Sequence, residues 1–299
     1  MHISVIVPSY RSQAQLPNTL KAIARQHTEL DIEVVVVDCT ETDDIRKICD
    51  EYPQVRFAHE SERFNPGKGR NIGAKLAQGE LLVFVDSDVV LQADALGEAY
   101  AFFQQGKPIF GGALELNEET SKTVASYLEH FFFNHESQRG RQVQQRSNLS
   151  SALMLFSREI FLKEGGFRDI PRMQDTELTE RLRARGYELF FTPRVVGLQT
   201  QDSPLSKVLR KIYINGKNLY FIRYQQKSLP FKIALGVGLP ALGGVKVARI
   251  AARHLRYQTP KNRVVTLALL PLLAVSGAYW VAGLYRSMVL GGGIGKSRD

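Results

Sequence analysis

The feature that most constrains the fold is an apolar run that ends in two carboxylates. Leu81 to Val85 are all apolar and lead directly into Asp86, Ser87 and Asp88. A run of this length with β-branched and aromatic members is typical of a strand buried on both faces of a parallel sheet. Ligands of such sheets bind beyond the carboxyl ends of the strands. The sequence therefore predicts that both carboxylates emerge at a ligand-binding edge, although a simple turn after the strand also accounts for the spacing.

The acidic pair itself predicts a metal. Two carboxylates one residue apart repel each other unless a cation or a proton lies between them. Oxygen ligands of this kind suit Mg²⁺ or Mn²⁺, which proteins bind jointly with substrate phosphates. We therefore predict a divalent metal at Asp86 and Asp88, shared with a phosphorylated ligand.

Strands and helices alternate before this motif. Residues 3–7 and 31–38 read as strands, and helical patterns cover residues 13–26, 42–51 and 67–77. This alternation indicates βαβ units, and hence an α/β fold with a mixed, mostly parallel sheet flanked by helices.

The segment from Gly67 to Gly73 combines three glycines with Lys68, Arg70 and Asn71. Such a composition favours close approach of the backbone to a ligand and an anion at a helix start. It is not a Walker loop, because no Gly-Lys-Ser or Gly-Lys-Thr ends it. A flexible basic loop is the more common explanation of such a cluster taken alone. In a βαβ setting we predict phosphate and ribose contacts here, with Arg70 as the preferred residue.

Further motifs follow the same arrangement. The early ones are Val5 to Tyr10, Val36 to Asp38, Gly69 to Gly73 and Phe84 to Asp88, and the later ones are Gly165 to Arg168, Gln174 to Leu178 and Arg181 to Tyr187. Together, over about the first 225 residues, their order and spacing resemble the family 2 glycosyltransferases of the GT-A (Rossmann-like) fold.

The resemblance implies inverting transfer of a sugar from a nucleotide-diphosphate donor, UDP-linked by preference, with Mg²⁺ or Mn²⁺. A cation at Asp88 stabilises the charge of the leaving diphosphate. Asp86 then faces the ribose or the water shell of the metal, with Ser87 between them in the donor site.

The same resemblance implies a nucleoside pocket at the ends of the first two strands. Asp38 is expected beside the uracil ring, and Pro8, Ser9 and Tyr10 are expected to line the pocket. Strand-end turns account for these residues without any ligand.

Asp175 is the predicted general base, because it precedes a helix in the block that the family places opposite the acidic pair. A plain N-cap is the alternative. Two positions depart from the family pattern. Gln174 replaces a common Glu, and Gln199 stands where relatives often carry a metal-binding histidine.

Two other functions remain open. Asp86 followed by Asp88 also resembles the nucleophile motif of haloacid-dehalogenase-like phosphatases, but no later strand with paired acids completes that motif. The second alternative is a catalytically silent membrane-binding GT-A module, suggested by Gln174 and Gln199.

The basic charge is concentrated at the C-terminal end. Of 39 Lys and Arg residues, 11 lie in residues 227–299 together with a single acid. Lys246, Arg249, Arg253 and Arg256 recur at helical spacing opposite apolar residues, which is typical of a helix on an anionic membrane surface rather than of a nucleic-acid contact. We predict a GT-A domain over residues 1–225 and a membrane-association region over residues 226–299.

The 22 residues from Val264 to Tyr285 carry no charge and are long enough to cross a bilayer. Pro271, Gly277 and Gly283 are expected to kink or loosen this segment. Both a re-entrant or interfacial hairpin and a true span within residues 229–290 stay open, as does a buried helix of a soluble dimer.

The expected location is the cytoplasmic face of the inner membrane, with a lipid-linked or membrane-borne acceptor. Cys39 and Cys49 form no disulfide framework, and no signal segment precedes Ile3.

Overall fold

The computed structural model describes residues 1–291 and residue 293. Two compact units share the chain. The first comprises Met1–Asn117, Arg141–Asp169 and Gln174–Thr200, and the second comprises Glu118–Gly140, Ile170–Met173 and the chain from Gln201 onward. The second unit thus begins before the expected boundary near residue 225, because Val208 and Ile212 are buried in its core. Lys296 and Arg298, the basic residues after the long uncharged segment, lie outside the described residues.

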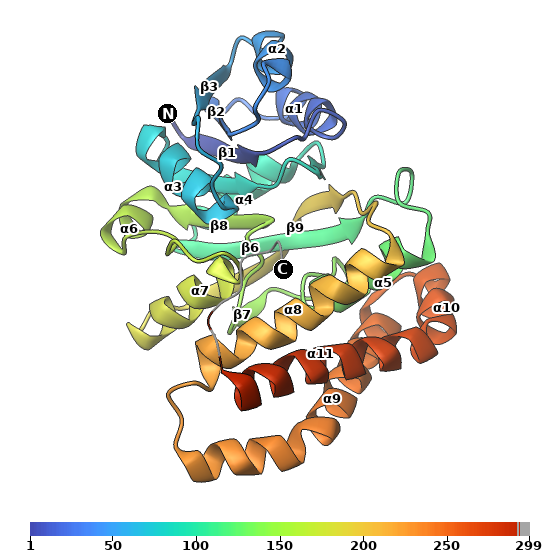
Figure 1. The fold of residues 1–299 in the computed structure, drawn as a ribbon. Coiled ribbons are helices and arrows are strands. Elements are labelled where there is room, and N and C mark those ends of the chain that lie inside the picture. The colour runs from blue at the N-terminus through green and yellow to red at the C-terminus, as the bar shows by residue number, and fades with distance from the viewer. Residues whose placement is uncertain (292, 294–299) are drawn as a thin grey trace. The chain divides into compact units, whose positions relative to one another are not determined.

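Within the described residues, the first unit contains one nine-stranded sheet with the order β3-β2-β1-β4-β8-β6-β9-β5, and β7 pairs with β9 (Figure 1). The strands β1 to β4 are parallel to one another, whereas β8 runs antiparallel to β4 and β6. The predicted mixed sheet is therefore confirmed: β1 to β4 form a parallel group in the N-terminal half, β6 and β9 are also parallel, and the remaining pairs are antiparallel. The bounds are β1 (Ile3–Ser9), β2 (Ile32–Asp38), β3 (Val55–His59), β4 (Leu81–Val85), β5 (Val89–Leu91), β6 (Ile109–Leu116), β7 (Gln144–Arg146), β8 (Leu153–Ser157) and β9 (Leu189–Gln199).

Helices cover both faces of this sheet, as the continuous apolar strands require. Val5 and Val83 belong to one buried cluster, and their neighbours Ile6 and Phe84 belong to the other, because successive side chains of a strand point to opposite faces. The helices of the first unit are α1 (Leu16–Ala24), α2 (Asp44–Asp50), α3 (Pro66–Leu76), α4 (Ala95–Phe103), α6 (Arg158–Lys163) and α7 (Gln174–Ala184).

The sheet register brings the predicted site residues to one edge. Ile6 on β1 pairs with Phe84 on β4, and Ser9 at the end of β1 pairs with Asp38 at the end of β2. The carboxyl ends of these parallel strands therefore open on the same edge, where Asp86 follows β4.

The second unit is helical. It contains α5 (Val124–Asn134), α8 (Leu205–Arg223), α9 (Leu229–Tyr257), α10 (Pro260–Ala268) and α11 (Leu270–Leu290). Two glycines let α8 and α11 come into contact, because a Cβ on Gly216 would lie 2.0 Å from the Trp280 carbonyl oxygen and one on Gly283 would lie 2.0 Å from that of Tyr213. Gly283 thus permits a close contact between α8 and α11.

The long uncharged segment is not one straight helix. It divides at Leu269 into α10 and α11, which are bent by 64°. By length and composition, α9 is a candidate membrane span, and the bent pair of α10 and α11 passes the same test together. Residues 233–245 are uncharged and lie inside the 29 residues of α9.

The predicted basic stripe on α9 does not face outward as a set. Lys246 lies over the rings of Phe132 and Trp280, at 4.8 and 4.9 Å from their centroids. Arg253 pairs with Glu136 at 2.5 Å. The prediction of a four-residue basic stripe against a membrane is therefore wrong for these two members, because aromatic rings and a carboxylate of the second unit hold them.

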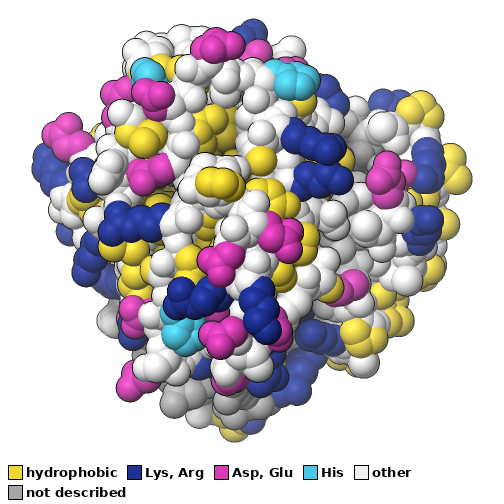
Figure 2. All heavy atoms as spheres, turned by 90° about the horizontal axis from the view of Figure 1, so that it is seen from above, with side chains coloured by type: hydrophobic (Ala, Val, Ile, Leu, Met, Phe, Trp, Pro, Cys, Tyr) yellow, Lys and Arg dark blue, Asp and Glu magenta, His cyan; other side chains and the backbone are white. Residues whose placement is uncertain are grey.

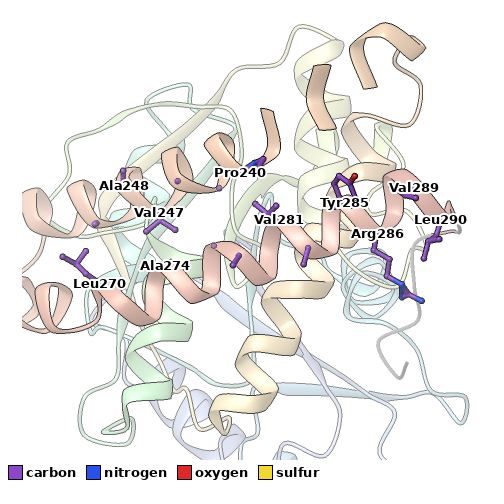
Figure 3. A pocket seen from close by; sticks show the side chains of 16 residues that line it. Pro240, Val247, Ala248, Leu270, Ala274, Val281, Tyr285, Arg286, Val289 and Leu290 are labelled. Atoms are coloured by element: carbon purple, nitrogen blue, oxygen red, sulfur yellow. The ribbon is translucent and has the colours of Figure 1, made fainter. Parts of the chain in front are cut away.

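An apolar groove of about 910 Å³ runs between α9 and α11. Val247 and Val281 lie between the two helices in Figure 3, and Arg286 lies near the C-terminal end of α11. The groove is wide because its lining includes small residues such as Gly244, beside which a Cβ would meet nothing within 4 Å.

Candidate active site

Asp86 and Asp88 lie in the turn that follows β4. The turn is closed by the Val89 amide, which donates to the Asp86 carbonyl at 3.0 Å. Gln199 Nε2 donates to Asp88 Oδ1 at 3.3 Å. Both carboxylates are only partly buried, so the strand delivers them to an accessible edge, as the sequence predicts. The carbonyl of Ser87 accepts a hydrogen bond from Thr19 Oγ1 at 2.8 Å, which anchors the turn to α1.

Arg70 contacts the acidic pair rather than lying on a flexible loop. Its guanidinium forms an ion pair with Asp86, and only 2% of its surface is exposed. The ring of Phe167 lies 5.5 Å from its central carbon. Arg70 therefore compensates the charge of Asp86, whereas Asp88 accepts a hydrogen bond from Gln199.

The other residues of the glycine-rich segment serve packing and loop anchoring. Asn71 donates from Nδ2 to the Phe167 carbonyl at 2.7 Å and accepts from the Phe167 amide at 2.9 Å. The Lys68 amide donates to the N-cap residue Asn65 at 3.0 Å. A Cβ on Gly73 would lie 2.4 Å from Ile6 Cγ2. Gly73 therefore allows close approach to β1, and the anion contact expected of this segment remains a prediction.

A polar cluster joins the ends of β1 and β2. Asp38 is fully buried, and its Oδ1 accepts from Ser9 Oγ at 2.7 Å and from Thr40 Oγ1 at 2.8 Å. The Thr40 amide donates to Oδ2 at 2.9 Å. Nearby, the ring of Tyr10 lies 4.1 Å from the guanidinium carbon of Arg63. Pro8 lies within β1, one residue before its end, and pairs with Val37 in the sheet register.

Asp175 lies in the first turn of α7, which begins at Gln174, so the N-cap alternative is wrong. Its Oδ1 accepts from the Thr176 amide at 2.7 Å, and its Oδ2 accepts from the Ser151 amide at 3.5 Å. Burial raises the pKa of Asp175, the two amides and the positive charge of Arg70 lower it, and the negative charge of Asp86 raises it further. Asp175 is thus within electrostatic range of the residues that flank the acidic pair.

The later motif block forms a rigid support for α7. Arg181 donates to the carbonyls of Glu164 and Gly166 at 2.7 and 2.6 Å, and it pairs with Glu177 at 2.9 Å. Arg168 also pairs with Glu177, at 3.1 Å. Gly165 and Gly166 adopt φ values of +77° and +63°, a region that favours glycine. These residues position Asp175 through the backbone of α7.

Sequence reasoning missed Ser151 and Thr176, whose backbone amides donate to Asp175. Amide donors carry no side-chain signal, so only the folded loop reveals them. Gln199 was noted as a departure from the family pattern, and its contact with Asp88 shows that it lies at the acidic pair.

A family model described as Glycosyl transferase family 2 matches residues 4–165, more than half of the chain. The chain belongs to this family. The family 2 chain is 36% identical over 110 residues to the poly(ribitol-phosphate) beta-N-acetylglucosaminyltransferase TarS of Staphylococcus aureus, a match that covers 35% of this chain and 19% of TarS. It therefore spans only about a fifth of the length of that relative. Family membership overturns the phosphatase alternative.

Two solved structures show the fold. Residues 1–349 of S. aureus TarS with UDP-GlcNAc give a TM-score of 0.54 at 16% identity, covering 96% of this chain and 90% of that one. A mannosyltransferase from Pyrobaculum calidifontis, solved with GDP-Man and Mn²⁺, gives a TM-score of 0.62 at 20% identity. This match covers 96% of this chain and 87% of the mannosyltransferase. The GT-A fold expected from the sequence is thereby confirmed.

Proposed function

We propose that this family 2 protein transfers a sugar, with inversion, from a nucleotide-diphosphate donor to a hydroxyl or phosphate of a membrane-borne acceptor. The observation that carries the proposal is that adjacent residues hold Asp175 and Asp86, because the Ser151 amide donates to Asp175 at 3.5 Å and the Asp86 amide donates to the Ala152 carbonyl at 3.2 Å. A candidate base and a candidate donor site thus share one edge of the sheet. A UDP-linked donor is preferred, because TarS has been solved with UDP-GlcNAc.

Asp175 acts as the base in this proposal. Burial raises the pKa of its carboxyl, which makes the ionised form a better proton acceptor than an ordinary aspartate. The Ser151 and Thr176 amides orient its two oxygens. The acceptor proton moves to the Asp175 carboxylate while the acceptor oxygen attacks the anomeric carbon from the face opposite the diphosphate. The bond between the anomeric carbon and the diphosphate oxygen breaks, and the nucleoside diphosphate leaves with that electron pair.

The donor set at the acidic edge fits a hard divalent cation. Asp88 offers carboxylate oxygens beside the amide of Gln199, whereas the charge of Asp86 is compensated by Arg70. Among the described residues, no group of three or more His, Cys, Asp and Glu residues could hold a metal ion. Asp88 would therefore hold Mg²⁺ or Mn²⁺ together with phosphate oxygens and water, the arrangement usual for Mg²⁺. When bound, the cation stabilises charge on the leaving diphosphate.

In this proposal, the main role of Asp38 is to hold in place the residues that line the nucleoside pocket. Its oxygens already accept hydrogen bonds from Ser9 and Thr40, so it fixes the two strand ends that line the pocket. The ring of Tyr10, held beside Arg63, supplies a stacking surface for a base.

Donor binding by the full chain tests the proposal. We expect calorimetry with UDP-GlcNAc and Mn²⁺ to show binding that is lost on chelation, and slow hydrolysis of the donor to water. GDP-mannose serves as the competing donor. A chain that binds neither nucleotide sugar, with or without metal, is the silent module that the sequence left open.

We propose in addition that the second unit binds the cytoplasmic face of a membrane through α9, α10 and α11. Of the nineteen large hydrophobic side chains exposed among the described residues, fourteen lie in residues 229–290. Val237 is 82% exposed and Val264 is 67% exposed. Apolar surface of this extent marks an interaction site, and hydrocarbon covers it without requiring polar partners. The face shown in Figure 2 instead mixes Lys and Arg with Asp and Glu.

Removing the tail at residue 226 is a poor test, because α8 would lose its contact with α11. Substituting Ile233, Val237 and Val264 by Gln in the full chain avoids this problem. We expect the triple variant to lose flotation with phosphatidylcholine vesicles. The control replaces Val124, Val143 and Leu162, which are exposed outside the three helices, and should float like the unaltered chain. Equal flotation of both variants would refute membrane binding through these helices.

A further inference from the structure

The loop between β7 and β8 contacts both parts of the candidate active site. The amide of Ser151 donates to Asp175 Oδ2 at 3.5 Å. The carbonyl of the next residue, Ala152, accepts a hydrogen bond from the Asp86 amide at 3.2 Å. Two consecutive loop residues therefore join the candidate base to the turn that bears the acidic pair, and all four residues belong to the first unit.

The side chain of Asn148 fixes this loop to α7. Its Oδ1 accepts from Thr179 Oγ1 at 2.8 Å, and its Nδ2 donates to Thr176 Oγ1 at 3.4 Å. Thr179 is fully buried, and its hydroxyl also lies 2.8 Å from the Asp175 carbonyl oxygen. The Thr176 amide donates to Asp175 Oδ1 at 2.7 Å. Asn148 thus contacts the two threonines that touch the backbone and the carboxylate of Asp175.

A buried side chain next to Asn148 also holds the loop. Leu149 is 5% exposed and belongs to the same buried cluster as Leu178 of α7. Its Cδ2 lies 3.1 Å from the place that a Cβ on Gly111 would occupy, so the glycine on β6 leaves room for it. The loop is therefore anchored by one polar and one apolar side chain just before Ser151.

We propose that Asn148 is a positioning residue, which sets the place of the Asp175 carboxylate relative to the turn that contains Asp86. The role rests on the proposed transferase function, in which Asp175 accepts the acceptor proton. The Ser151 contact, at 3.5 Å, is longer than the usual amide hydrogen bond of about 2.9–3.0 Å. A small shift of the loop would therefore break it. A misplacement of about 1 Å can slow an enzyme by ~10²-fold, so the anchor of this loop affects the rate without touching the substrate.

Hydrolysis of UDP-GlcNAc to water by the full chain with Mn²⁺ tests this role. Asn148→Ala should lower kcat by ~10–100-fold and leave the Kd of the donor nearly unchanged, because it displaces the base and not the donor. Gln145→Ala is the matched control, since the Gln145 amide donates to Glu188 at 2.6 Å rather than to α7, and it should hydrolyse like the unaltered chain. Thr179→Val should reproduce the loss, whereas Thr179→Ser keeps the hydroxyl and should retain most of the turnover.

Combination with Asp175→Asn separates positioning of the base from support of the fold. A residue that acts only through the base should cost nothing more once the base is removed, so Asn148→Ala should lower the remaining hydrolysis by less than about twofold in that background. The same fold-loss in both backgrounds would overturn the proposal. So would an equal loss in Gln145→Ala, or full turnover in both Asn148→Ala and Thr179→Val.

Hydrogen exchange tests the loop without turnover. The peptide that contains the Ser151 amide should exchange faster in Asn148→Ala than in the unaltered chain or in Gln145→Ala, because the loop opens more often. Unchanged exchange in Asn148→Ala refutes the positioning role. An unaltered chain that does not hydrolyse UDP-GlcNAc refutes the proposed function instead.

Discussion

The two units differ in the contacts of their buried polar groups and in the exposure of their apolar side chains. In the first unit, the buried carboxylate of Asp38 has three hydrogen-bond donors, and buried Arg70 is paired with Asp86. In the second unit, the Nε of Arg172 has no partner and Val237 is mostly exposed. Buried guanidinium nitrogens without a hydrogen-bond partner occur in both units, at Arg70 and Arg158 in the first and at Arg172 in the second, so the units differ chiefly in the apolar side chains that α9 to α11 expose.

Two glycines, one from each unit, differ in the space beside them, although Gly216 and Gly283 of the second unit are packed as closely as Gly73. A Cβ on Gly73 in α3 would collide with Ile6, whereas one on Gly238 in α9 would meet nothing within 4 Å. The glycine of the first unit is required by packing, while Gly238 has open space beside it. We expect substitutions in the two units to differ in their effects on activity and stability for this reason.

The largest effect is expected from Asp175→Asn. The amide keeps the shape of the side chain but cannot accept the acceptor proton, so turnover should fall by ~10²–10⁴-fold. Donor affinity and melting temperature should change little. Transfer assays with calorimetry on the same preparation provide the measurement. A variant that keeps most of its turnover would show that Asp175 only supports the first turn of α7.

Asp88→Ala should have the next largest effect, on metal-dependent donor binding. Removing the carboxylate that is not compensated by Arg70 should weaken donor affinity in Mn²⁺ by ~10–100-fold. Affinity measured with a chelator should be the same for both proteins. Asp88→Asn is the matched control for shape, and a full metal response in the Ala variant would exclude Asp88 as a ligand.

Sequence reasoning succeeded where function is carried by contiguous residues. The strand that ends in Asp86 and Asp88 forms as predicted, and α7 begins beside Asp175. These features depend on local patterns that survive in any arrangement of the remaining chain. The family, the sheet and the edge that bears the acidic pair were therefore accessible from the sequence.

Sequence reasoning failed where the partner of a side chain lies far along the chain. Lys246 was assigned to a membrane-facing stripe, but its ammonium lies over Phe132 and Trp280. In the glycine-rich segment, Asn71 binds the backbone of Phe167, a contact that the sequence did not reveal, while the phosphate contacts of this segment remain a prediction. Helical spacing predicts which residues lie on one face of a helix, but it does not predict which other part of the chain packs against that face.

Arg70→Gln tests the ion pair between Arg70 and Asp86 in the first unit. The change leaves Asp86 without its cation, and stability should fall by about 2 kcal/mol, less than for a fully buried pair because Asp86 is 32% exposed. Arg70 also lowers the pKa of Asp175. The acidic limb of the rate profile should therefore move to higher pH, since the base must be ionised. Denaturant melts and a pH profile measure both effects, and an unmoved limb would mean that the two residues do not interact.

Gly73→Ala should destabilise the first unit by about 1–3 kcal/mol, the usual cost of overpacking a core. The added methyl group would lie 2.4 Å from Ile6 Cγ2, so α3 or β1 must shift. Chemical denaturation measures the loss. Ile6→Val in the same background should restore part of it by making room, and no rescue would indicate that the collision occurs elsewhere.

Gly238→Ala should do the opposite and is the smallest effect expected. The position lies inside the 29-residue helix α9, where glycine costs backbone entropy and no neighbouring atom within 4 Å opposes a methyl group. Alanine should therefore stabilise α9 by roughly 0.5–1 kcal/mol. Melting of the full chain in detergent, compared with Gly73→Ala under the same conditions, measures the difference in sign. If both substitutions destabilise, α9 packs as tightly as α3, and the open space beside Gly238 does not exist in solution.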